Sequence, residues 1–364
     1  MERPDYEGAL ARKLAQITGT CANDWYLVYR ARHGMQVAFE AAREAMGEGT
    51  VATQLLTCCT AVDPILAAGL TPVYGEVDAA TCALDPELLP MDEKARAVVL
   101  QHTFGIVDDA SSAELAARAH KAGALVIEDC AHCVGRMARN ADGAPVADVS
   151  VHSFGVEKIL HTLFGGAVWV NPDSPLAGPA AEALREARSR LVALPEPAPR
   201  FERLAKTYPT VNRVLVHLPA AVSRPLRRAL TSAGAFDPAV SEEERLGRVS
   251  HAPMRPTAHA CAAAASALEG YEANLASRKE VISAYRARLS EALRAGVPLE
   301  VPAAALAGEP QPLLRMPVIA ASTALAEAAT RAICEAGFYT TAWYRPELGP
   351  GALDEATYLV PRDR

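Results

Sequence analysis

The sequence lacks the features that would direct a protein into a membrane or onto nucleic acid. No apolar run approaches the roughly 20 residues that span a bilayer, and the opening Met1-Glu2-Arg3-Pro4-Asp5 does not resemble a signal peptide. The 36 Lys and Arg residues are outnumbered by 43 Asp and Glu, so the formal net charge of -7 provides no general attraction for phosphate backbones. We therefore expect a cytoplasmic protein that binds no nucleic acid.

A dense cysteine framework is also missing. The eight cysteines are scattered along 364 residues, whereas small secreted domains carry closely and regularly spaced pairs. Cys130-Ala131-His132-Cys133 has the spacing of a redox pair or of half a zinc site, but no second pair at zinc spacing follows it. We expect reduced thiols and no metal site.

What is present is the alternation of short apolar runs and helical stretches that α/β folds produce. Over residues 24–172 this alternation predicts a mostly parallel sheet flanked by helices. The continuous apolar runs 97–100 and 124–127 indicate buried strands, and Ser111 opens a capping box for a helix between them. We predict a large α/β domain over residues 1–172.

The chain changes character after this domain. Prolines between residues 172 and 199 interrupt any long regular element, and residues 173–258 are predicted to form a Pro-rich and basic amphipathic helical excursion. Within it, residues 200–235 favour a solvated helical hairpin packed on its own domain, although such a stretch can also lie on a membrane surface or dock a partner. Residues 259–364 predict a smaller C-terminal α+β domain.

Three residues with useful chemistry follow the predicted strands. Asp129 lies at the carboxyl end of a buried strand, where open α/β sheets bind ligands. Ser153 lies near the end of the next predicted strand, residues 149–154, and Lys158 is in the loop after it. A pyridoxal cofactor needs a lysine for the imine, a carboxylate for the pyridine nitrogen and donors for the phosphate. Taken singly, each residue also has an ordinary interpretation, as a helix cap, a backbone-bonded serine or a solvated lysine.

The order and spacing of these residues resemble the DegT/DnrJ/StrS-type family of sugar aminotransferases. The resemblance is carried by residues 101–105 (QHTFG), 127–132 (IEDCAH) and 152–158 (HSFGVEK). It implies fold type I of the pyridoxal 5'-phosphate enzymes, the aspartate aminotransferase fold, with a large domain and a smaller C-terminal one. In the family pattern, Asp129 pairs with the pyridine nitrogen, Ser153 contacts the phosphate, Lys158 holds the cofactor as a Schiff base, and His132 lies near the ring.

The resemblance also points to the remainder of the cofactor site. By spacing, Gly34-Met35-Gln36 replaces the family's Ser-Gly-Thr at a helix amino terminus, where N–H groups attract anions. Arg32 or His33 could supply donors there. Thr57 keeps the family's Thr-aromatic step, whereas Cys58 replaces the aromatic residue that stacks on the ring.

Further departures concern the substrate side and the partner subunit. Phe164 replaces a glutamate of the family's loop near the substrate, where Tyr344 is also expected, and Pro253 stands where the partner subunit of relatives gives an asparagine to the phosphate. The resemblance implies a homodimeric aminotransferase that moves an amino group from glutamate or glutamine to a nucleotide-linked keto-sugar, in cell-envelope or secondary-metabolite sugar biosynthesis. The alternative is a cofactor-binding regulatory or scaffolding protein with little turnover.

Overall fold

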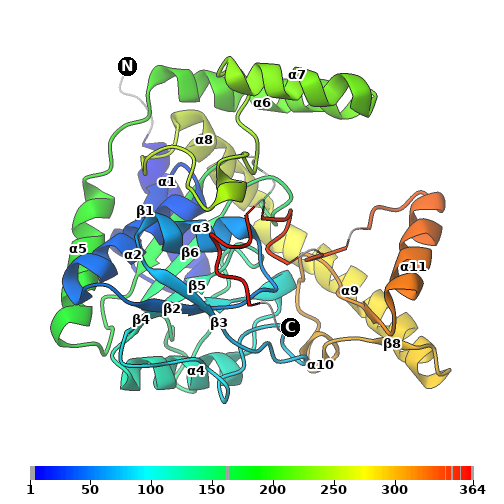
Figure 1. The fold of residues 1–364 in the computed structure, drawn as a ribbon, viewed down its shortest axis with the longest axis horizontal. Coiled ribbons are helices and arrows are strands. Elements are labelled where there is room, and N and C mark those ends of the chain that lie inside the picture. Colours follow the sequence, from blue (N-terminus) through cyan, green and yellow to red (C-terminus); the bar gives the residue numbers. More distant parts are fainter. Residues whose placement is uncertain are drawn as a thin grey trace.

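The computed structural model describes residues 5–160, 162, 164–340, 342–345, 347–352 and 354–361. Its centre is a seven-stranded mixed sheet with the strand order β1-β7-β6-β5-β4-β2-β3 (Figure 1). Strands β3, β2, β4, β5 and β6 are parallel, and β7 is antiparallel to both β6 and β1. The strands are β1 (Trp25–Val28), β2 (Thr50–Thr53), β3 (Thr71–Tyr74), β4 (Ala95–Gln101), β5 (Leu125–Asp129), β6 (Val149–Ser153) and β7 (Gly166–Val170).

Helices cover both faces of this sheet. On one face, α2 (Ala31–Met46) and α5 (Gly178–Val192) pack against a set of strand residues that includes Val99. On the other face, α4 (Asp109–Lys121) packs against a set that includes Val98. Neighbouring residues of a strand point to opposite faces, so a strand covered on both sides must be apolar throughout. The predicted mostly parallel sheet flanked by helices is confirmed.

The helix between β4 and β5 begins earlier than the capping box indicated. Its cap is Asp108, whose Oδ1 accepts a hydrogen bond from the Ser111 N–H at 2.9 Å. Ser111 therefore lies in the first turn instead of capping the helix. The segment Asp108-Asp109-Ala110-Ser111 offers more than one side chain that can cap, and the first of them is used.

The remaining elements surround the sheet or lead away from it. α1 (Tyr6–Thr18) packs with α8 (Ala258–Ala267) on the α4 side. The chain later returns to the sheet layer, where Tyr358 is buried beside α3 (Cys59–Ala67). The predicted boundaries at residues 172 and 258 stay predictions, although α5, which follows the first of them, packs on α2. An outlying part contains α9 (Tyr271–Arg294), β8 (Leu299–Glu300), α10 (Ala303–Leu306), β9 (Ile319–Ala320) and α11 (Thr323–Glu335) (Figure 1).

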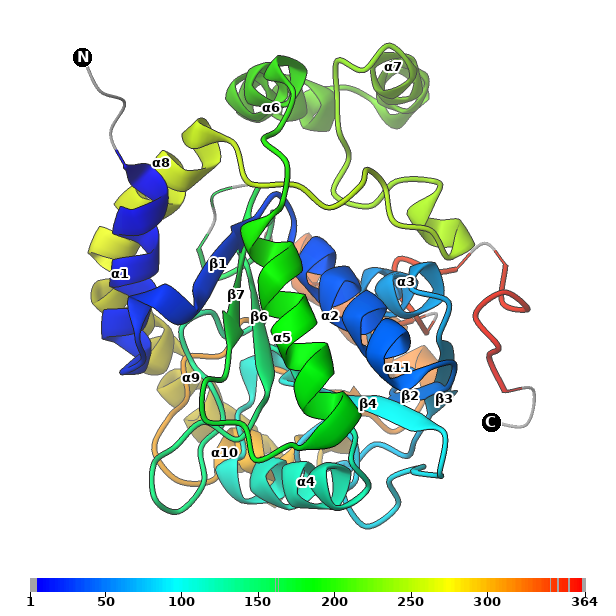
Figure 2. The same ribbon diagram turned by 90° about the vertical axis from the view of Figure 1, so that its left-hand side faces the viewer.

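The excursion contains a helical hairpin at one end of the molecule. α6 (Pro199–His217) and α7 (Ala220–Ser232) lie beside each other, beyond the edge of the sheet layer in both views (Figures 1 and 2). This arrangement matches the hairpin predicted for residues 200–235. Across the described ranges, no helix combines the length and the apolar character that crossing a membrane requires.

Candidate active site

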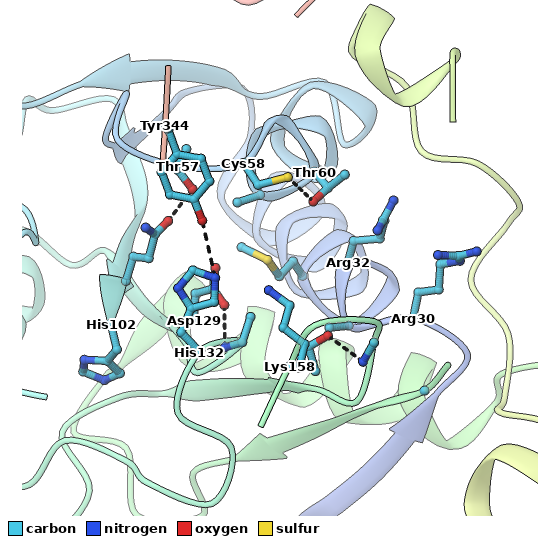
Figure 3. A pocket seen from close by; sticks show the side chains of 18 of the residues that line it. Arg30, Arg32, Thr57, Cys58, Thr60, His102, Asp129, His132, Lys158 and Tyr344 are labelled. Atoms are coloured by element: carbon cyan, nitrogen blue, oxygen red, sulfur yellow. Dashed lines mark hydrogen bonds between the residues drawn. The ribbon is translucent and has the colours of Figure 1, made fainter. Parts of the chain in front are cut away.

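A cavity lies at the carboxyl ends of β4, β5 and β6, beside the amino terminus of α2 (Figure 3). The last residues of these strands, Gln101, Asp129 and Ser153, all line it. Open α/β sheets bind ligands at this edge because the carboxyl ends of parallel strands meet there. The cavity brings together ten residues that the sequence predicted for the site: Arg32, Met35, Thr57, Cys58, Asp129, His132, Ser153, Lys158, Phe164 and Tyr344.

Lys158 and Asp129 place an amine and a carboxylate in this cavity. Burial lowers the pKa of Lys158 and raises the pKa of Asp129, and each side chain favours the charged form of the other. Asp129 Oδ1 accepts a hydrogen bond from the Ala131 N–H at 2.9 Å, which fixes the carboxylate at the end of β5. Among the described residues, the Lys158 amine forms no hydrogen bond or ion pair. The cavity therefore contains an amine that gives up its proton more readily than an exposed lysine does.

His132 presents a fixed N–H donor to the cavity. Its Nδ1 accepts a hydrogen bond from the Phe104 N–H at 3.1 Å, so the proton of the neutral ring resides on Nε2. Burial lowers the pKa of His132 well below its usual range, which keeps the ring neutral. Nε2 lies 3.4 Å from the Tyr344 hydroxyl, whose pKa burial raises. Both groups are therefore uncharged hydrogen-bonding partners in the cavity.

The amino terminus of α2 forms a cationic end of the cavity. α2 begins at Ala31, and no side chain caps it, so its first N–H groups can bind an anion. Arg32, in the first turn, lines the cavity and forms an ion pair with Glu244. Burial would raise the pKa of Glu244, but the Arg32 guanidinium holds that pKa below its usual range. Arg32 is thus held in place by a buried carboxylate.

The residues that spacing proposed for an anion site are distributed differently. Of the three, Met35 lines the cavity, while Gly34 packs against the sheet and Gln36 bonds along the helix. The reason is that α2 starts three residues before Gly34, so the second turn of the helix, not the first, contains this segment. His33 is buried and bonded to a backbone carbonyl, which leaves Arg32 as the side-chain donor at this end.

Ser153 and two glycines complete this part of the cavity. Ser153 Oγ accepts a hydrogen bond from the Gly155 N–H at 3.3 Å, so its own proton is available to a ligand. Gly165 has a φ of 109°, a conformation that a side chain would strain. A Cβ at Gly166 would come within 2.7 Å of the Ala31 nitrogen. The two glycines therefore allow the start of β7 to approach the amino terminus of α2.

Thr57 and Cys58 form the wall at the start of α3. The Thr57 hydroxyl donates a hydrogen bond to the Gln101 side chain, and Cys58 precedes the first residue of α3. Hydrogen bonds from the Cys59 thiol and the Thr60 hydroxyl lower the pKa of Cys58 to about 6, although burial opposes the shift. The position of the family's stacking aromatic is thus occupied by a thiol that ionises easily.

Phe164 contributes an apolar part of the cavity wall. Its ring stacks on Tyr29 with centroids 5.7 Å apart and meets Tyr208 of α6 edge-on at 4.9 Å. The Arg30 guanidinium lies 5.2 Å from the Phe164 ring centre and pairs with Asp237 at 2.7 Å. Where the family pattern has a glutamate, this chain has an aromatic residue anchored to α6.

Four lining residues with polar side chains were not singled out from the sequence as members of the site. Gln101 and His102 lie in the motif 101–105, so the resemblance contained the signal that could have found them. The position of the Arg30 side chain depends on its ion pair with Asp237, which is far away in the chain. No local sequence pattern indicates that contact. The four residues are Arg30, Thr60, Gln101 and His102.

His102 also belongs to a buried group with Cys130 and Cys133, whose donor atoms all lie within 4.8 Å of one another. Glu128 Oε1 lies 2.8 Å from His102 Nε2. Burial raises the pKa of Cys130 well above its usual range, which keeps that thiol protonated. Because the His102–Glu128 pair already balances charge within the group, we assign no ion to it, and the absence of a metal site stays a prediction.

The segment around Pro253 is tied to its own chain. The Met254 carbonyl accepts a hydrogen bond from the Tyr29 N–H at 3.0 Å. Arg255 forms ion pairs with Glu7 at 2.5 Å and with Glu196 at 3.1 Å. The Arg255 side chain is therefore engaged away from the cavity.

The donors in the cavity fit pyridoxal 5'-phosphate. The first N–H groups of α2, together with Arg32 and the Ser153 hydroxyl, suit a phosphate dianion. Asp129 suits a protonated pyridine nitrogen, because such a cation would offset the burial that raises the pKa of this carboxylate. In the view of Figure 3, Lys158 lies between Asp129 and Arg32.

Comparison with known proteins places these features in a family. The chain is 28% identical to the pleiotropic regulatory protein of Geobacillus stearothermophilus, over 41% of this chain and 42% of that protein. It is 32% identical to the L-glutamine:2-deoxy-scyllo-inosose aminotransferase of Streptomyces lividus, over 43% of this chain and 37% of that protein. The chain thus spans about two-fifths of the length of the curated relatives it matches.

The fold is similar to that of solved sugar aminotransferases. The structure of DesI in the presence of its TDP-sugar product matches 97% of this chain and 75% of that one, with a TM-score of 0.61 and 19% identity. The fold is therefore that of the type I pyridoxal phosphate enzymes, as predicted. Residues 6–188 match the family described as the DegT/DnrJ/EryC1/StrS aminotransferase family. The chain therefore belongs to the DegT/DnrJ/EryC1/StrS aminotransferase family, whose aminotransferases depend on pyridoxal 5'-phosphate.

Proposed function

We propose that this protein is a pyridoxal phosphate-dependent aminotransferase that moves an amino group from an amino acid to a keto-sugar. The observation that carries the proposal is the convergence of Lys158, Asp129 and Arg32 in one cavity. The proposed donor is glutamate or glutamine, and the name of the Streptomyces lividus relative, which includes L-glutamine, supports it. The proposed acceptor is a nucleotide-linked keto-sugar of cell-envelope or secondary-metabolite biosynthesis, and the TDP-sugar product of DesI supports a nucleotide.

The residues of the cavity bind and orient the cofactor. When bound, pyridoxal phosphate supplies an aldehyde that captures the donor amine and a ring that withdraws electrons from the donor's α-carbon. Asp129 would accept a hydrogen bond from the protonated ring nitrogen and so preserve this withdrawal. The Nε2–H of His132 would be available to the ring hydroxyl, and Ser153, Arg32 and the first N–H groups of α2 would hold the phosphate.

Lys158 moves the proton in both halves of the reaction. Its uncharged amine would take a proton from the donor's α-carbon, and in the acceptor half the same group would deliver a proton to the acceptor carbon. A base must be uncharged to accept a proton. Burial lowers the pKa of Lys158, which favours the uncharged amine, while Asp129 and Cys58 oppose that shift.

Tyr344 and Phe164 are the proposed substrate contacts. Both line the cavity, and the high pKa of Tyr344 keeps its hydroxyl as a donor as well as an acceptor. Phe164 gives the cavity an apolar wall segment. We expect the acceptor to place a less polar edge against Phe164 than the acceptors of relatives with a glutamate there.

The proposal includes a homodimer in the cytoplasm. A homodimer follows from the family resemblance, and analytical ultracentrifugation of the purified protein would measure the assembled mass. The cytoplasmic location is supported by the cysteines, all eight of which are unpaired, because disulfides persist mainly in oxidising compartments.

A spectroscopic titration tests the cofactor assignment. Protein mixed with pyridoxal phosphate should develop the visible absorbance of a lysine-bound aldehyde, and Lys158→Ala should abolish it. Lys279→Ala, at an exposed lysine of α9, should leave the band intact. A band that persists in Lys158→Ala would remove Lys158 from its proposed role.

The second candidate is a pyridoxal phosphate-binding regulatory or scaffolding protein with little turnover. Cys58 and Phe164 favour it, because they replace a stacking aromatic and a polar wall residue of the family pattern. The name of the Geobacillus stearothermophilus relative also favours it. Incubating the loaded protein with single amino acids separates the candidates: an aminotransferase loses its aldehyde absorbance with glutamate or glutamine, whereas a regulator keeps it with every amino acid.

A further inference from the structure

The hairpin of α6 and α7 has a helix with no buried residue. α6 buries five residues, including Phe201 and Tyr208, whereas α7 buries none. Phe201 and Tyr208 pack against Tyr29 and Phe164 at 5.2 and 4.9 Å between ring centroids, so the base of the hairpin is firmly attached. An isolated helix of this length is marginal in water, since most helices are stabilised by packing of one face. The exposed faces of the hairpin are therefore candidates for a contact with another surface.

The hairpin is strongly basic within an acidic protein. Residues 199–232 contain seven Lys and Arg and one Asp or Glu, a formal charge of +6 in a chain whose total is -7. The single acidic residue, Glu202, pairs with Lys206 at 3.0 Å. Within the described part of the chain, several of the basic side chains form no ion pair with a carboxylate. They are Arg203, Arg213, Arg224, Arg227 and Arg228.

The hairpin also exposes apolar side chains. Val214 and Val216 of α6 are 54% and 65% exposed, and Val222 and Leu226 of α7 are 50% and 37% exposed. All four lie within eight residues of the turn at Leu218-Pro219. Val222 and Leu226 are four apart and share one face of α7, and Arg224 and Arg228 share the opposite face. This division of apolar and basic residues is typical of helices that lie in a membrane interface.

We propose that the α6–α7 hairpin binds an anionic lipid surface. Val222 and Leu226 enter the boundary between head groups and acyl chains, and the long arginine side chains reach the surrounding phosphates. The positive charge and the exposed apolar side chains of the hairpin favour this partner, because a surface of anionic lipids offers negative charge and an apolar interior together. The contact is independent of the reaction in the cavity.

Other occupants match the hairpin less well. A second copy placed hairpin against hairpin would bring two charges of +6 together, which is repulsive at physiological salt. A nucleic acid would satisfy the charge and leave the exposed valines without an apolar partner.

Vesicle flotation of the full-length protein tests the proposal. Protein should float with phosphatidylcholine vesicles that contain phosphatidylglycerol, should not float with phosphatidylcholine alone, and should dissociate as salt is raised. Arg224→Glu/Arg228→Glu should weaken binding at least about tenfold, since each basic residue near the surface contributes on the order of a twofold to tenfold gain. The conservative variant Arg224→Lys/Arg228→Lys should retain vesicle binding. Val222→Asp/Leu226→Asp, like the glutamate variant, should lose vesicle binding.

Matched controls separate lipid binding from damage to the fold. Arg288→Glu/Arg294→Glu changes the same charge on α9, outside the hairpin, and should float like the unmodified protein. Unchanged helical circular dichroism and cofactor absorbance would show that each variant is folded. The proposal would be overturned if the protein did not float, or if it floated equally well with and without phosphatidylglycerol. It would also be overturned if no vesicle binding occurred and the hairpin variants instead lost self-association or RNA binding.

Discussion

The hydroxyl of Thr60 donates a hydrogen bond to the Sγ of Cys58 at 3.1 Å. The neighbouring Cys59 thiol and this bond lower the pKa of Cys58 to about 6, against the effect of burial. The sulfur lies at the start of α3 and lines the cavity that contains Lys158. The relationship gives this site a nucleophilic thiol where the family pattern has an aromatic ring.

The first prediction concerns the reactivity of Cys58. Because the thiolate is the reactive form, iodoacetamide should alkylate Cys58 with a rate that rises through about pH 6 and is nearly constant above pH 7. Thr60→Val removes one donor, and the apparent pKa of alkylation should rise by about one unit. Mass spectrometry of the peptide measures the rate. Cys21→Ser/Cys334→Ser provides the background, since those two cysteines are exposed.

Protection by the cofactor gives the same experiment a second readout. Bound pyridoxal phosphate should slow alkylation of Cys58, because both occupy one cavity. Equal rates with and without cofactor, or an apparent pKa above 8, would contradict the geometry described for this wall.

The second prediction restores the missing ring contact. Cys58→Tyr should tighten the binding of pyridoxal phosphate by roughly threefold to tenfold, because stacked aromatic pairs contribute about 0.5–1.5 kcal/mol beyond area burial. Absorbance titration measures the dissociation constant. Cys58→Ala, which removes the thiol and adds no ring, serves as the control and should not tighten binding. A tyrosine variant that binds no better than the alanine variant would show that the ring is held elsewhere.

The third prediction concerns the anion end of the cavity. Arg32→Gln should weaken pyridoxal phosphate by roughly tenfold to one-hundredfold, since a hydrogen bond to a charged group contributes about 1.5–3 kcal/mol. Arg32→Gln alone leaves Glu244 buried without its partner, so Arg32→Gln/Glu244→Gln should keep the fold while binding remains weak. Arg43→Gln, at the other end of α2, should bind normally.

Inorganic phosphate supplies an independent check on Arg32. Phosphate should compete with pyridoxal phosphate in the unmodified protein and should compete less well in the double variant. Equal competition in both proteins would assign the phosphate to another part of the cavity.

Much of the sheet could be predicted because its strands are covered on both faces. The continuous apolar runs around Val98 and Val126 identify β4 and β5 without any tertiary information. Asp129, Ser153 and Lys158 then fall at one edge because they follow neighbouring strands. The order of these residues along the chain was therefore enough to predict that they lie at the same edge of the sheet.

The anion end could not be predicted in the same way. The start of α2 is determined by a contact across the sheet, where the Gly165 N–H donates to the Tyr29 carbonyl at 3.0 Å. Arg32 and Arg30 are held by Glu244 and Asp237, which are more than two hundred residues away in the chain. Neither contact leaves a local pattern, so spacing placed the Gly34-Met35-Gln36 segment one turn too late, although Arg32 was named as a possible donor.

The fourth prediction concerns a buried carboxyl that connects α3 with the last described segment. Asp63 Oδ1 accepts a hydrogen bond from the Tyr358 hydroxyl at 2.5 Å, and its other oxygen finds no hydrogen-bond partner among the described residues. Burial raises the pKa of Asp63 to about 9, whereas the pKa of an aspartate in an unfolded chain is about 3.9. A group whose pKa is raised on folding gives stability that is present below the unfolded value and lost as pH rises. Asp63 should therefore cost stability progressively between about pH 4 and pH 9.

Asp63→Asn removes this titration and keeps the acceptor oxygen for Tyr358. Thermal unfolding should show similar stability for both proteins near pH 4 and an advantage for the asparagine variant that grows by up to about 1.4 kcal/mol per pH unit, to as much as about 5 kcal/mol at pH 8. The comparison isolates one group because every other titrating residue is common to both proteins. An asparagine variant that is less stable at pH 8, or a difference that does not change with pH, would mean that Asp63 is ionised in the folded protein and is stabilised by Arg32, whose charge favours that form.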